Sequence, residues 1–426
     1  MNTSQSYAVT PLRSALNAVV HVPGSKSVAA RALVCAAMAT GESTVSNLPS
    51  GDDTKSMLSG LSLLGVQVDQ VGDTAHFSSS LDVEQKDPIV LDARLAGTTA
   101  RFLTALAALR SGEVVITGEE ALRRRPMHDL HQALLDIGFH VSPLNGPGML
   151  PVAVKRGEQK SSRVNIAATT SSQFTTALML IAPKLPLGLS IISEGDVVSQ
   201  SYLDMTVGVQ QSFGVTPAEN NEQVFRYAPG EYVGANYTVE PDASSASYPL
   251  AAAAIVGGRV VVSGLGRSSL QGDSHFVDVL AQMGCVVERN ADDVVLSRTR
   301  ENPLKGVIVD MRDMSDLVPT LAVVAAFAQS ATTITGVGFI RKKESDRIGD
   351  LAHELRTLGV LVDELPDGLT IHPSVPHAGN VDTHHDHRLA MSIALIGLVT
   401  PGVVINDPMV VTKSWPEYWT MLGGLQ

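Results

Sequence analysis

Apolar and polar residues recur along this chain in a repeated order: an extended apolar run, a turn, an amphipathic run of helical spacing, then a glycine. In one copy the apolar residues share one face of a helix, and Gly359 follows where that helix should end. These apolar residues are Ile348, Leu351, Leu355 and Leu358. Glycine suits the end because it reaches the left-handed C-cap conformation without a steric penalty. Each copy is therefore predicted to contain a strand, a loop, a helix and a glycine stop.

The glycine stops recur at intervals of 64 to 76 residues: Gly65, Gly138, Gly214, Gly284, Gly359 and Gly423. A period of this length means one supersecondary unit used repeatedly, and it is too long for a solenoid turn. Strand-like runs stand ahead of several helices, at 114–118, 260–264, 332–336 and 403–407. We therefore expect six βα-type units. The apolar stretch 16–22 has no unit of its own, and we expect it to complete the sixth.

A chain of 426 residues is too long for one core, so we expect two domains of three units each. The expected borders put residues 1–23 and 242–426 in one domain and residues 24–241 in the other. No apolar run is long enough to span a membrane, and we recognise no secretory or transit segment. Cys35 and Cys285 both lie in apolar runs, which predicts buried thiols in a reduced, cytoplasmic protein.

The net charge of −12 makes the chain a poor general binder of nucleic acid or anionic membrane. The basic residues nevertheless gather in the loops that should open the helices. This distribution indicates a site for small anions.

Three motifs of the first half suit such a site. Gly24-Ser25-Lys26-Ser27 leads into a helix but lacks the first glycine of a P-loop, so nucleotide triphosphate binding is not supported. Ala96-Gly97-Thr98 repeats this arrangement, and Arg123-Arg124-Arg125-Pro126 should open another helix with Pro126 in its first position. Helix N-termini offer free N–H groups to phosphate or carboxylate. The same motifs are equally typical of ordinary turns at the start of a helix.

Hydroxyl and amide groups cluster later in this half, at Thr170-Ser171-Ser172-Gln173 and at Ser199 and Tyr202. They could cap helices, and they could equally cradle a phosphate. Asp242, before another alanine-rich run, is expected to be a structural cap.

In the second half, Lys343, Glu344 and Arg347 are expected in one helical turn, with the two cations on one face. An exposed ion-pair helix is the alternative, although Glu344 beside a lysine suits a general acid or base. Asp316 precedes a long apolar run, which predicts a raised pKa.

His384-His385-Asp386-His387-Arg388 could bind zinc, but consecutive residues on a tight turn rarely converge on one ion. We favour an anion-binding turn with Arg388 as donor. Lys413 should start the last helix with one more cation.

Taken in order, these motifs resemble the enolpyruvyl transferase family, and within it the branch that acts on shikimate 3-phosphate. The motifs that carry the resemblance are Gly24-Ser25-Lys26-Ser27, Ala96-Gly97-Thr98, Arg125-Pro126, Ser171-Ser172-Gln173, Asp242-Ala243-Ser244-Ser245-Ala246, Lys343-Glu344-Ser345-Asp346-Arg347, Asp386-His387-Arg388 and Lys413. The resemblance implies an α/β (α+β) fold of two domains, each with three βαββαβ units around a pseudo-threefold axis. The active site would lie in the interdomain cleft.

The resemblance also implies a reaction: the enolpyruvyl group of phosphoenolpyruvate passes to the 5-hydroxyl of shikimate 3-phosphate, with release of phosphate. This addition and elimination runs through a tetrahedral intermediate without metal or organic cofactor, in chorismate and aromatic amino-acid biosynthesis. The substrates would be small molecules only, with no nucleic acid or membrane partner, and the protein would be a monomer.

Residue roles follow from the same resemblance. Asp316 would be the base, and Glu344 with Lys26 would transfer the other proton. Shikimate 3-phosphate would meet Lys26, Ser27, Arg31, Ser171, Ser172, Gln173, Ser199, Tyr202, Asp316 and Lys343. Phosphoenolpyruvate would meet Lys26, Gly97, Arg125, Gln173, Arg347, Arg388 and Lys413.

The chain departs from the family pattern at Leu95, Phe102 and Phe339, where asparagine, proline and asparagine are frequent. Because glyphosate targets this family, these departures leave glyphosate sensitivity open. The sister enzyme that uses UDP-N-acetylglucosamine is the close alternative, but its loop cysteine has no counterpart within 118–125. A non-catalytic anion-binding protein of the same fold would keep the arginines and lose the carboxylates of Asp316 and Glu344.

Overall fold

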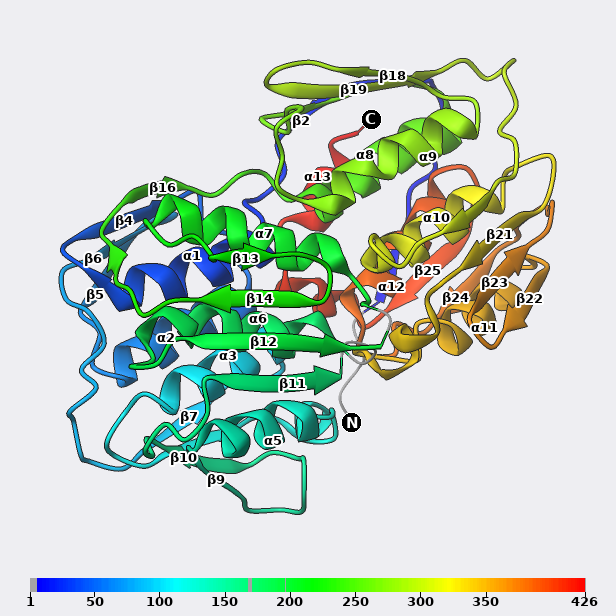
Figure 1. Cartoon of the computed structure of the whole chain (residues 1–426). Coiled ribbons are helices and arrows are strands. Elements are labelled where there is room, and N and C mark those ends of the chain that lie inside the picture. Colours follow the sequence, from blue (N-terminus) through cyan, green and yellow to red (C-terminus); the bar gives the residue numbers. More distant parts are fainter. Residues whose placement is uncertain (1–5, 168–170, 196, 426) are drawn as a thin grey trace. The chain divides into compact units, whose positions relative to one another are not determined.

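A computed structural model describes residues 6–167, 171–195 and 197–425 (Figure 1). The chain divides into two compact units. The continuous unit is Gly24–Val239, and the split unit combines Met1–Pro23 with Glu240–Gln426. The second border therefore lies two residues before the expected one.

In the continuous unit, the described residues form three four-stranded sheets, ordered β16-β4-β6-β5, β7-β8-β10-β9 and β11-β12-β14-β13, and a two-stranded sheet β15-β3. The strands are β3 (Ala39–Thr40), β4 (Ser43–Ser46), β5 (Val68–Val71), β6 (Thr74–Phe77), β7 (Ile89–Asp92), β8 (Val114–Thr117), β9 (His140–Pro143), β10 (Val152–Lys155), β11 (Arg163–Ala167), β12 (Leu189–Glu194), β13 (Glu219–Asn220), β14 (Val224–Tyr227), β15 (Tyr232–Val233) and β16 (Asn236–Thr238). The helices are α1 (Lys26–Met38), α2 (Asp52–Leu63), α3 (Gly97–Ala107), α4 (Glu120–Arg123), α5 (His128–Ile137), α6 (Ser172–Ile181), η1 (Ala182–Lys184) and α7 (Gln200–Ser212).

In the split unit, the described sheets are ordered β18-β19-β17-β2, β20-β21-β23-β22 and β1-β25-β24. The strands are β1 (Ser6–Ala8), β2 (Leu16–Val20), β17 (Gly258–Ser263), β18 (Val286–Arg289), β19 (Asp293–Arg298), β20 (Ile308–Asp310), β21 (Thr332–Thr335), β22 (Val362–Leu365), β23 (Gly368–Ile371), β24 (Gly379–Val381) and β25 (Val403–Asn406). The helices are α8 (Ala243–Val256), η2 (Gly272–His275), α9 (Phe276–Gln282), η3 (Ser315–Leu317), α10 (Val318–Ala325), η4 (Gly338–Lys342), α11 (Gly349–Thr357), α12 (His387–Ala394), η5 (Leu395–Leu398), η6 (Pro408–Lys413) and α13 (Tyr418–Gly423).

The four-stranded sheets share one plan. In the third sheet of the continuous unit, β11 runs parallel to β12, while β14 and β13 complete the sheet as an antiparallel hairpin. The helix α6 lies between β11 and β12, and the helix α7 connects β12 to the hairpin. This repeat therefore has the order strand, helix, strand, helix and two returning strands (Figure 1). The predicted strands at 114–118, 260–264, 332–336 and 403–407 are confirmed as β8, β17, β21 and β25.

Five of the six expected glycine stops follow helices with left-handed backbone, with φ between 80° and 117°. They are Gly65, Gly138, Gly214, Gly284 and Gly359. The prediction is wrong at Gly423, which is the last residue of α13 and has no positive φ.

The prediction that stretch 16–22 completes the sixth unit is also wrong. Its strand β2 pairs in parallel with β17, in the fourth repeat. The sixth repeat is completed by β1, which pairs antiparallel with β25. In β2, Leu16 and Val20 are buried while Asn17 and Val19 are exposed. This alternation defines the buried face of a strand, but it does not identify the neighbouring strand.

Buried helices form the core of each unit. In α8 every residue is buried, and α1 is buried from Val28 to Met38. A helix that is apolar all round must be enclosed by other elements. Both cysteines lie in these cores as predicted, buried and without a disulfide. No helix in the described part of the chain is both long and apolar enough to cross a membrane.

Candidate functional site

In the continuous unit, the buried side chain of Arg31 joins the first turns of several helices. Its Nη1 donates to the Ser27 carbonyl of α1 at 2.7 Å, and its Nη2 donates to the Tyr202 carbonyl of α7 at 3.1 Å. Its Nε donates to Thr206 Oγ1 at 2.8 Å, and Nη2 lies 3.4 Å from Thr176 Oγ1 of α6. Arg31 is 2% exposed. It therefore holds the starts of α1, α6 and α7 together, and in this conformation it faces protein acceptors.

Lys26 begins α1 beside a carboxylate of α2. Its Nζ lies 3.2 Å from Asp53 Oδ2, and the main-chain oxygen of Asp53 accepts a hydrogen bond from Thr99 in the first turn of α3. Ser25 caps α1 by accepting from the Val28 N–H. The sequence did not mark Asp53, since nothing in the local pattern of α2 identifies it as the partner of Lys26.

Two guanidinium groups meet at the start of α3. A Cβ on Gly97 would lie 2.7 Å from Arg125 Nη1 and 3.2 Å from Arg101 Nη1. Arg101 in turn donates to the side chain of Gln173 on α6 and to the carbonyl of Pro126 at 3.3 Å. Because Gly97 has no side chain, Arg125 can lie directly against the N-terminus of α3.

The three consecutive arginines have different surroundings. Arg123 donates to the carbonyl of Gly118, and Arg124 pairs with Glu120 one helical turn earlier. Arg125 lies beside Gly97. The expectation that Pro126 opens a helix is wrong, since α5 begins at His128 with Met127 as its N-cap. Arg123 is instead the last residue of the short helix α4, and Arg124 is its C-cap.

The starts of α6 and α7 present hydroxyl groups. Ser171 caps α6 by accepting from the Gln173 N–H at 3.3 Å, and Ser172 follows it. Ser199 precedes α7 in a left-handed conformation with φ of 59°. The Tyr202 ring lies 5.9 Å from the Arg31 guanidinium. Thr170, the first residue of the predicted cluster, lies outside the described residues.

In the split unit, Asp316 lies among three cations. Its Oδ1 accepts from Arg347 Nη1 at 2.8 Å, its Oδ2 accepts from Arg388 Nη2 at 2.8 Å, and Lys343 Nζ lies 3.7 Å away. Burial alone would raise the pKa of Asp316, but the charges of Arg388, Lys343 and Arg347 outweigh it and hold the pKa well below its usual range. The predicted raised pKa is therefore wrong, because the cations come from distant parts of the sequence.

Arg347 is the centre of this network and is 1% exposed. Besides Asp316, its Nε donates to Asp386 at 2.7 Å and its Nη2 donates to Glu344 at 2.8 Å. Burial would lower the pKa of Arg347, yet the neighbouring carboxylates raise it. Within the described part of the chain its side chain donates hydrogen bonds to carboxylates, the group that the fork of a guanidinium binds best.

The segment around Lys343 and Arg347 is not helical as predicted. The helix η4 ends at Lys342, and α11 begins only at Gly349. The two cations still converge, because the intervening turn brings both to Asp316. The anion between the like charges is thus a residue of the chain itself.

The histidine-rich turn leads into α12. Asp386 caps this helix by accepting from the Arg388 N–H at 2.9 Å, and it also accepts from Ser345 Oγ at 3.0 Å. The three histidines of this turn have different surroundings. The His384 ring lies 2.7 Å from a Glu354 oxygen, the His385 ring lies 3.4 Å from an Asp407 oxygen, and His387 is buried. Among the described residues no group of side chains is arranged to hold a metal ion.

Two further residues complete the description of the split unit's cluster. Lys413 ends η6, which packs against α12, and does not start a helix as expected, since α13 begins at Tyr418. Asp242 caps α8 by accepting from the Ser245 N–H at 2.7 Å, as predicted. Two of the three departures from the family pattern lie beside cations: the Phe339 ring is 5.9 Å from Lys343 Nζ in the split unit, and the Phe102 ring is 5.6 Å from the Arg31 guanidinium in the continuous unit.

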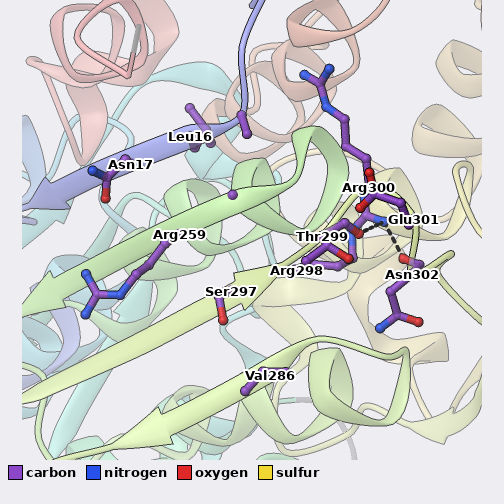
Figure 2. A pocket seen from close by; sticks show the side chains of 12 residues that line it. Leu16, Asn17, Arg259, Val286, Ser297, Arg298, Thr299, Arg300, Glu301 and Asn302 are labelled. Carbon is purple, nitrogen blue, oxygen red and sulfur yellow. Dashed lines mark hydrogen bonds between the residues drawn. The ribbon is translucent and has the colours of Figure 1, made fainter.

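A cavity of about 630 Å³ lies elsewhere in the split unit, at one end of the sheet β18-β19-β17-β2 (Figure 2). Arg259 faces it from β17, beside Asn17 of β2 and Ser297 of β19. None of the predicted site residues lines this cavity. The cationic clusters, and not this cavity, are therefore the candidate active-site groups.

Comparison with known proteins shows the family of this chain. The sequence model of the family described as EPSP synthase (3-phosphoshikimate 1-carboxyvinyltransferase) matches residues 12–422. A 3-phosphoshikimate 1-carboxyvinyltransferase of Nostoc sp. (strain PCC 7120) is 39% identical over 419 residues, which are 97% of each chain. The enzyme of that name from Methanothermobacter thermautotrophicus is 41% identical and covers 95% of this chain and 94% of its own.

Solved structures agree. An EPSP synthase from Acinetobacter baumannii matches 99% of this chain and 98% of its own, with a TM-score of 0.83 and 26% identity. The enolpyruvyl transferase NikO from Streptomyces tendae has the same fold, with a TM-score of 0.76 and 18% identity. The predicted fold class is thereby confirmed. The chain belongs to the EPSP synthase (3-phosphoshikimate 1-carboxyvinyltransferase) family.

Proposed function

We propose that this chain transfers the enolpyruvyl group of phosphoenolpyruvate to the 5-hydroxyl of shikimate 3-phosphate and releases phosphate. Membership of the family supports the reaction. The observation that carries it in the structure is Asp316, a carboxylate in contact with Arg347, Arg388 and Lys343. The reaction needs cations because both substrates are polyanions. It also needs a proton acceptor for the attacking 5-hydroxyl.

Shikimate 3-phosphate is assigned chiefly to the continuous unit. Its phosphate would meet hydroxyls and N–H groups where α6 and α7 begin, at Ser171, Ser172, Ser199 and Tyr202. Lys26, Ser27, Gln173, Asp316 and Lys343 would surround the ring. Arg31 is retained in this set on the resemblance, although its guanidinium is largely taken up by protein acceptors.

Phosphoenolpyruvate is assigned to the guanidinium and ammonium groups of both clusters. Its carboxylate and phosphate oxygens suit the forks of arginine side chains. The proposed set is Lys26, Gly97, Arg125, Gln173, Arg347, Arg388 and Lys413. Arg347 would join this set by giving up its hydrogen bond to one carboxylate of the chain and binding the carboxylate of phosphoenolpyruvate instead.

The chemistry follows from the charge on Asp316. Its low pKa keeps it ionised and able to accept a proton, and a bound anion that draws Arg388 or Lys343 away would raise that pKa towards the range of an effective base. The 5-hydroxyl oxygen then bonds to C2 of phosphoenolpyruvate while its proton passes to Asp316. Glu344 with Lys26 delivers a proton to the methylene carbon, which completes the tetrahedral intermediate. Loss of phosphate and of one proton from the new methyl group restores the enol ether.

The remaining assignments follow from the family resemblance. The reaction would need no metal or organic cofactor, and the partners would be small molecules and not nucleic acid. The protein would act as a cytoplasmic monomer in the synthesis of chorismate and aromatic amino acids.

Acceptor choice tests this proposal. Phosphate release from phosphoenolpyruvate is measured with shikimate 3-phosphate or UDP-N-acetylglucosamine as acceptor, with and without a chelator. We expect release only with shikimate 3-phosphate, unchanged by the chelator. Release only with the UDP-sugar would assign the chain to the sister reaction, and release with neither acceptor would overturn the proposed activity.

A further inference from the structure

Asp273 is a buried carboxyl group that the mechanism above does not use. It lies in η2, is 4% exposed, and accepts a hydrogen bond from Ser244 Oγ in the first turn of α8. Its other oxygen, Oδ1, is buried and has no hydrogen-bond partner among the described residues. A buried carboxylate with an unsatisfied oxygen is costly, so its position calls for an explanation.

Ser244 connects Asp273 to the cationic cluster of the split unit. Arg388 Nη2 lies 3.5 Å from Ser244 Oγ and 2.8 Å from Asp316 Oδ2. A guanidinium can only donate, so Ser244 Oγ presents its lone pair to Arg388 and directs its own hydrogen to Asp273. The donors and acceptors thus run in one direction, from Arg388 through Ser244 to Asp273.

We propose that Asp273 is a positioning residue for enolpyruvyl transfer: through Ser244 it orients the Arg388 guanidinium that binds phosphoenolpyruvate and pairs with Asp316. This inference rests on the proposed function. Asp273 acts on Arg388 through Ser244, and the proposed function assigns it no contact with either substrate. Its loss therefore weakens phosphoenolpyruvate binding more than shikimate 3-phosphate binding.

The charge of Asp273 depends on pH near neutrality. Burial raises the pKa of Asp273 to about 7, with a further contribution from the negative charge of Asp316. The other charged groups that face it are Arg388, which lowers the pKa, and Asp242 of α8, which raises it. Below pH 7 the protonated carboxyl is a weaker acceptor for Ser244, and Arg388 is then held mainly by Asp316.

The test compares Asp273→Asn and Ser244→Ala with the wild type in steady-state phosphate release. Asp278→Asn on α9 is the matched control, since Asp278 is exposed and pairs with Arg289. We expect the KM for phosphoenolpyruvate to rise about fivefold or more in both test variants, while the KM for shikimate 3-phosphate stays within about twofold. The control should behave as the wild type.

The pH profile separates positioning from a structural role. In the wild type and in Asp278→Asn, the KM for phosphoenolpyruvate should rise as pH falls below 7, and in Asp273→Asn this rise should be reduced. An unchanged KM and an unchanged profile in Asp273→Asn would overturn the inference. Equal losses for both substrates with a lowered melting temperature in both variants would also overturn it, by showing a structural role. A wild-type protein without activity would instead refute the proposed function.

Discussion

Arg347 and Lys26 differ in how their charges are balanced. Arg347 is enclosed by Asp316, Glu344 and Asp386, whereas Lys26 is more exposed and has Asp53 as one of its partners. The sequence placed Arg347 and Asp316 in the site by resemblance, but it predicted the wrong direction for the pKa of Asp316. That pKa depends on Arg388, which is remote in the chain and is brought near only by the packing of α10 against α12. Long-range electrostatics of this kind cannot be derived from local sequence.

The close approach of Arg125 to Gly97 gives a prediction at this scale. In Gly97→Ala the new methyl group would lie 2.7 Å from Arg125 Nη1, so the guanidinium must move. Losing one charge-assisted hydrogen bond costs about 1.5 kcal/mol, so the KM for phosphoenolpyruvate should rise roughly tenfold. Initial rates at fixed shikimate 3-phosphate measure this change.

Gly423→Ala is the control, because a Cβ there meets nothing within 4 Å and the backbone is not left-handed. It should leave both KM values unchanged. An unaltered KM for phosphoenolpyruvate in Gly97→Ala would show that Arg125 does not bind that substrate.

Among the elements, helices and their stops were the best predicted from sequence. The amphipathic spacing before Gly359 and Gly65 predicted α11 and α2 with correct C-terminal ends, because helix periodicity and a C-cap glycine are local signals. The turn 343–348 was not predicted, because its conformation is held by specific hydrogen bonds. The Arg347 side chain donates to Asp386, and the Asp346 side chain accepts from the Gly349 N–H. A charged sequence of this kind is equally compatible with a helix.

The turn before α12 gives a pH-dependent prediction. Burial would lower the pKa of His384, but its hydrogen bond to Glu354 and the carboxylates of Asp350 and Asp382 outweigh this effect and raise the pKa. The resulting stability is fully present below the unfolded pKa of about 6.5 and is lost as pH rises through the raised folded pKa. His384→Asn should therefore lower the melting temperature clearly at pH 6 and less at pH 9.

Asparagine is chosen because the backbone of His384 is left-handed, with φ of 49°. His385→Asn is the matched control, since His385 is also left-handed but its side chain is 87% exposed. Thermal unfolding followed by circular dichroism makes the comparison. A melting-temperature difference for His384→Asn that is the same at both pH values would contradict the assigned ion pair.

For the whole molecule, the repeat predicted six units, but the partners of the N-terminal strands could not be predicted. The strand β2 joins β17 and β1 joins β25, so the split unit is built from segments at opposite ends of the chain. In the continuous unit, β16 likewise returns to pair with β4. A strand's own pattern gives its buried face, whereas its partner depends on the packing of the entire unit.

This topology predicts how fragments behave. Residues 24–239 contain all partners of their own sheets, so this fragment should unfold cooperatively on its own. Residues 240–426 lack β1 and β2 and should not, unless a peptide of residues 6–23 is added. Circular dichroism with thermal melting tests both expectations, and a cooperative transition of 240–426 without the peptide would contradict the second.

The central claim is that Asp316 accepts the proton of the attacking hydroxyl among cations that bind the substrates. The most direct measurement is phosphate release by Asp316→Asn at saturating phosphoenolpyruvate and shikimate 3-phosphate. Asp310→Asn is the control, since Asp310 is exposed and pairs with Arg312. We predict that kcat falls by about 10²–10⁴-fold in Asp316→Asn and is unchanged in Asp310→Asn. A kcat of Asp316→Asn equal to that of the wild type would contradict the account.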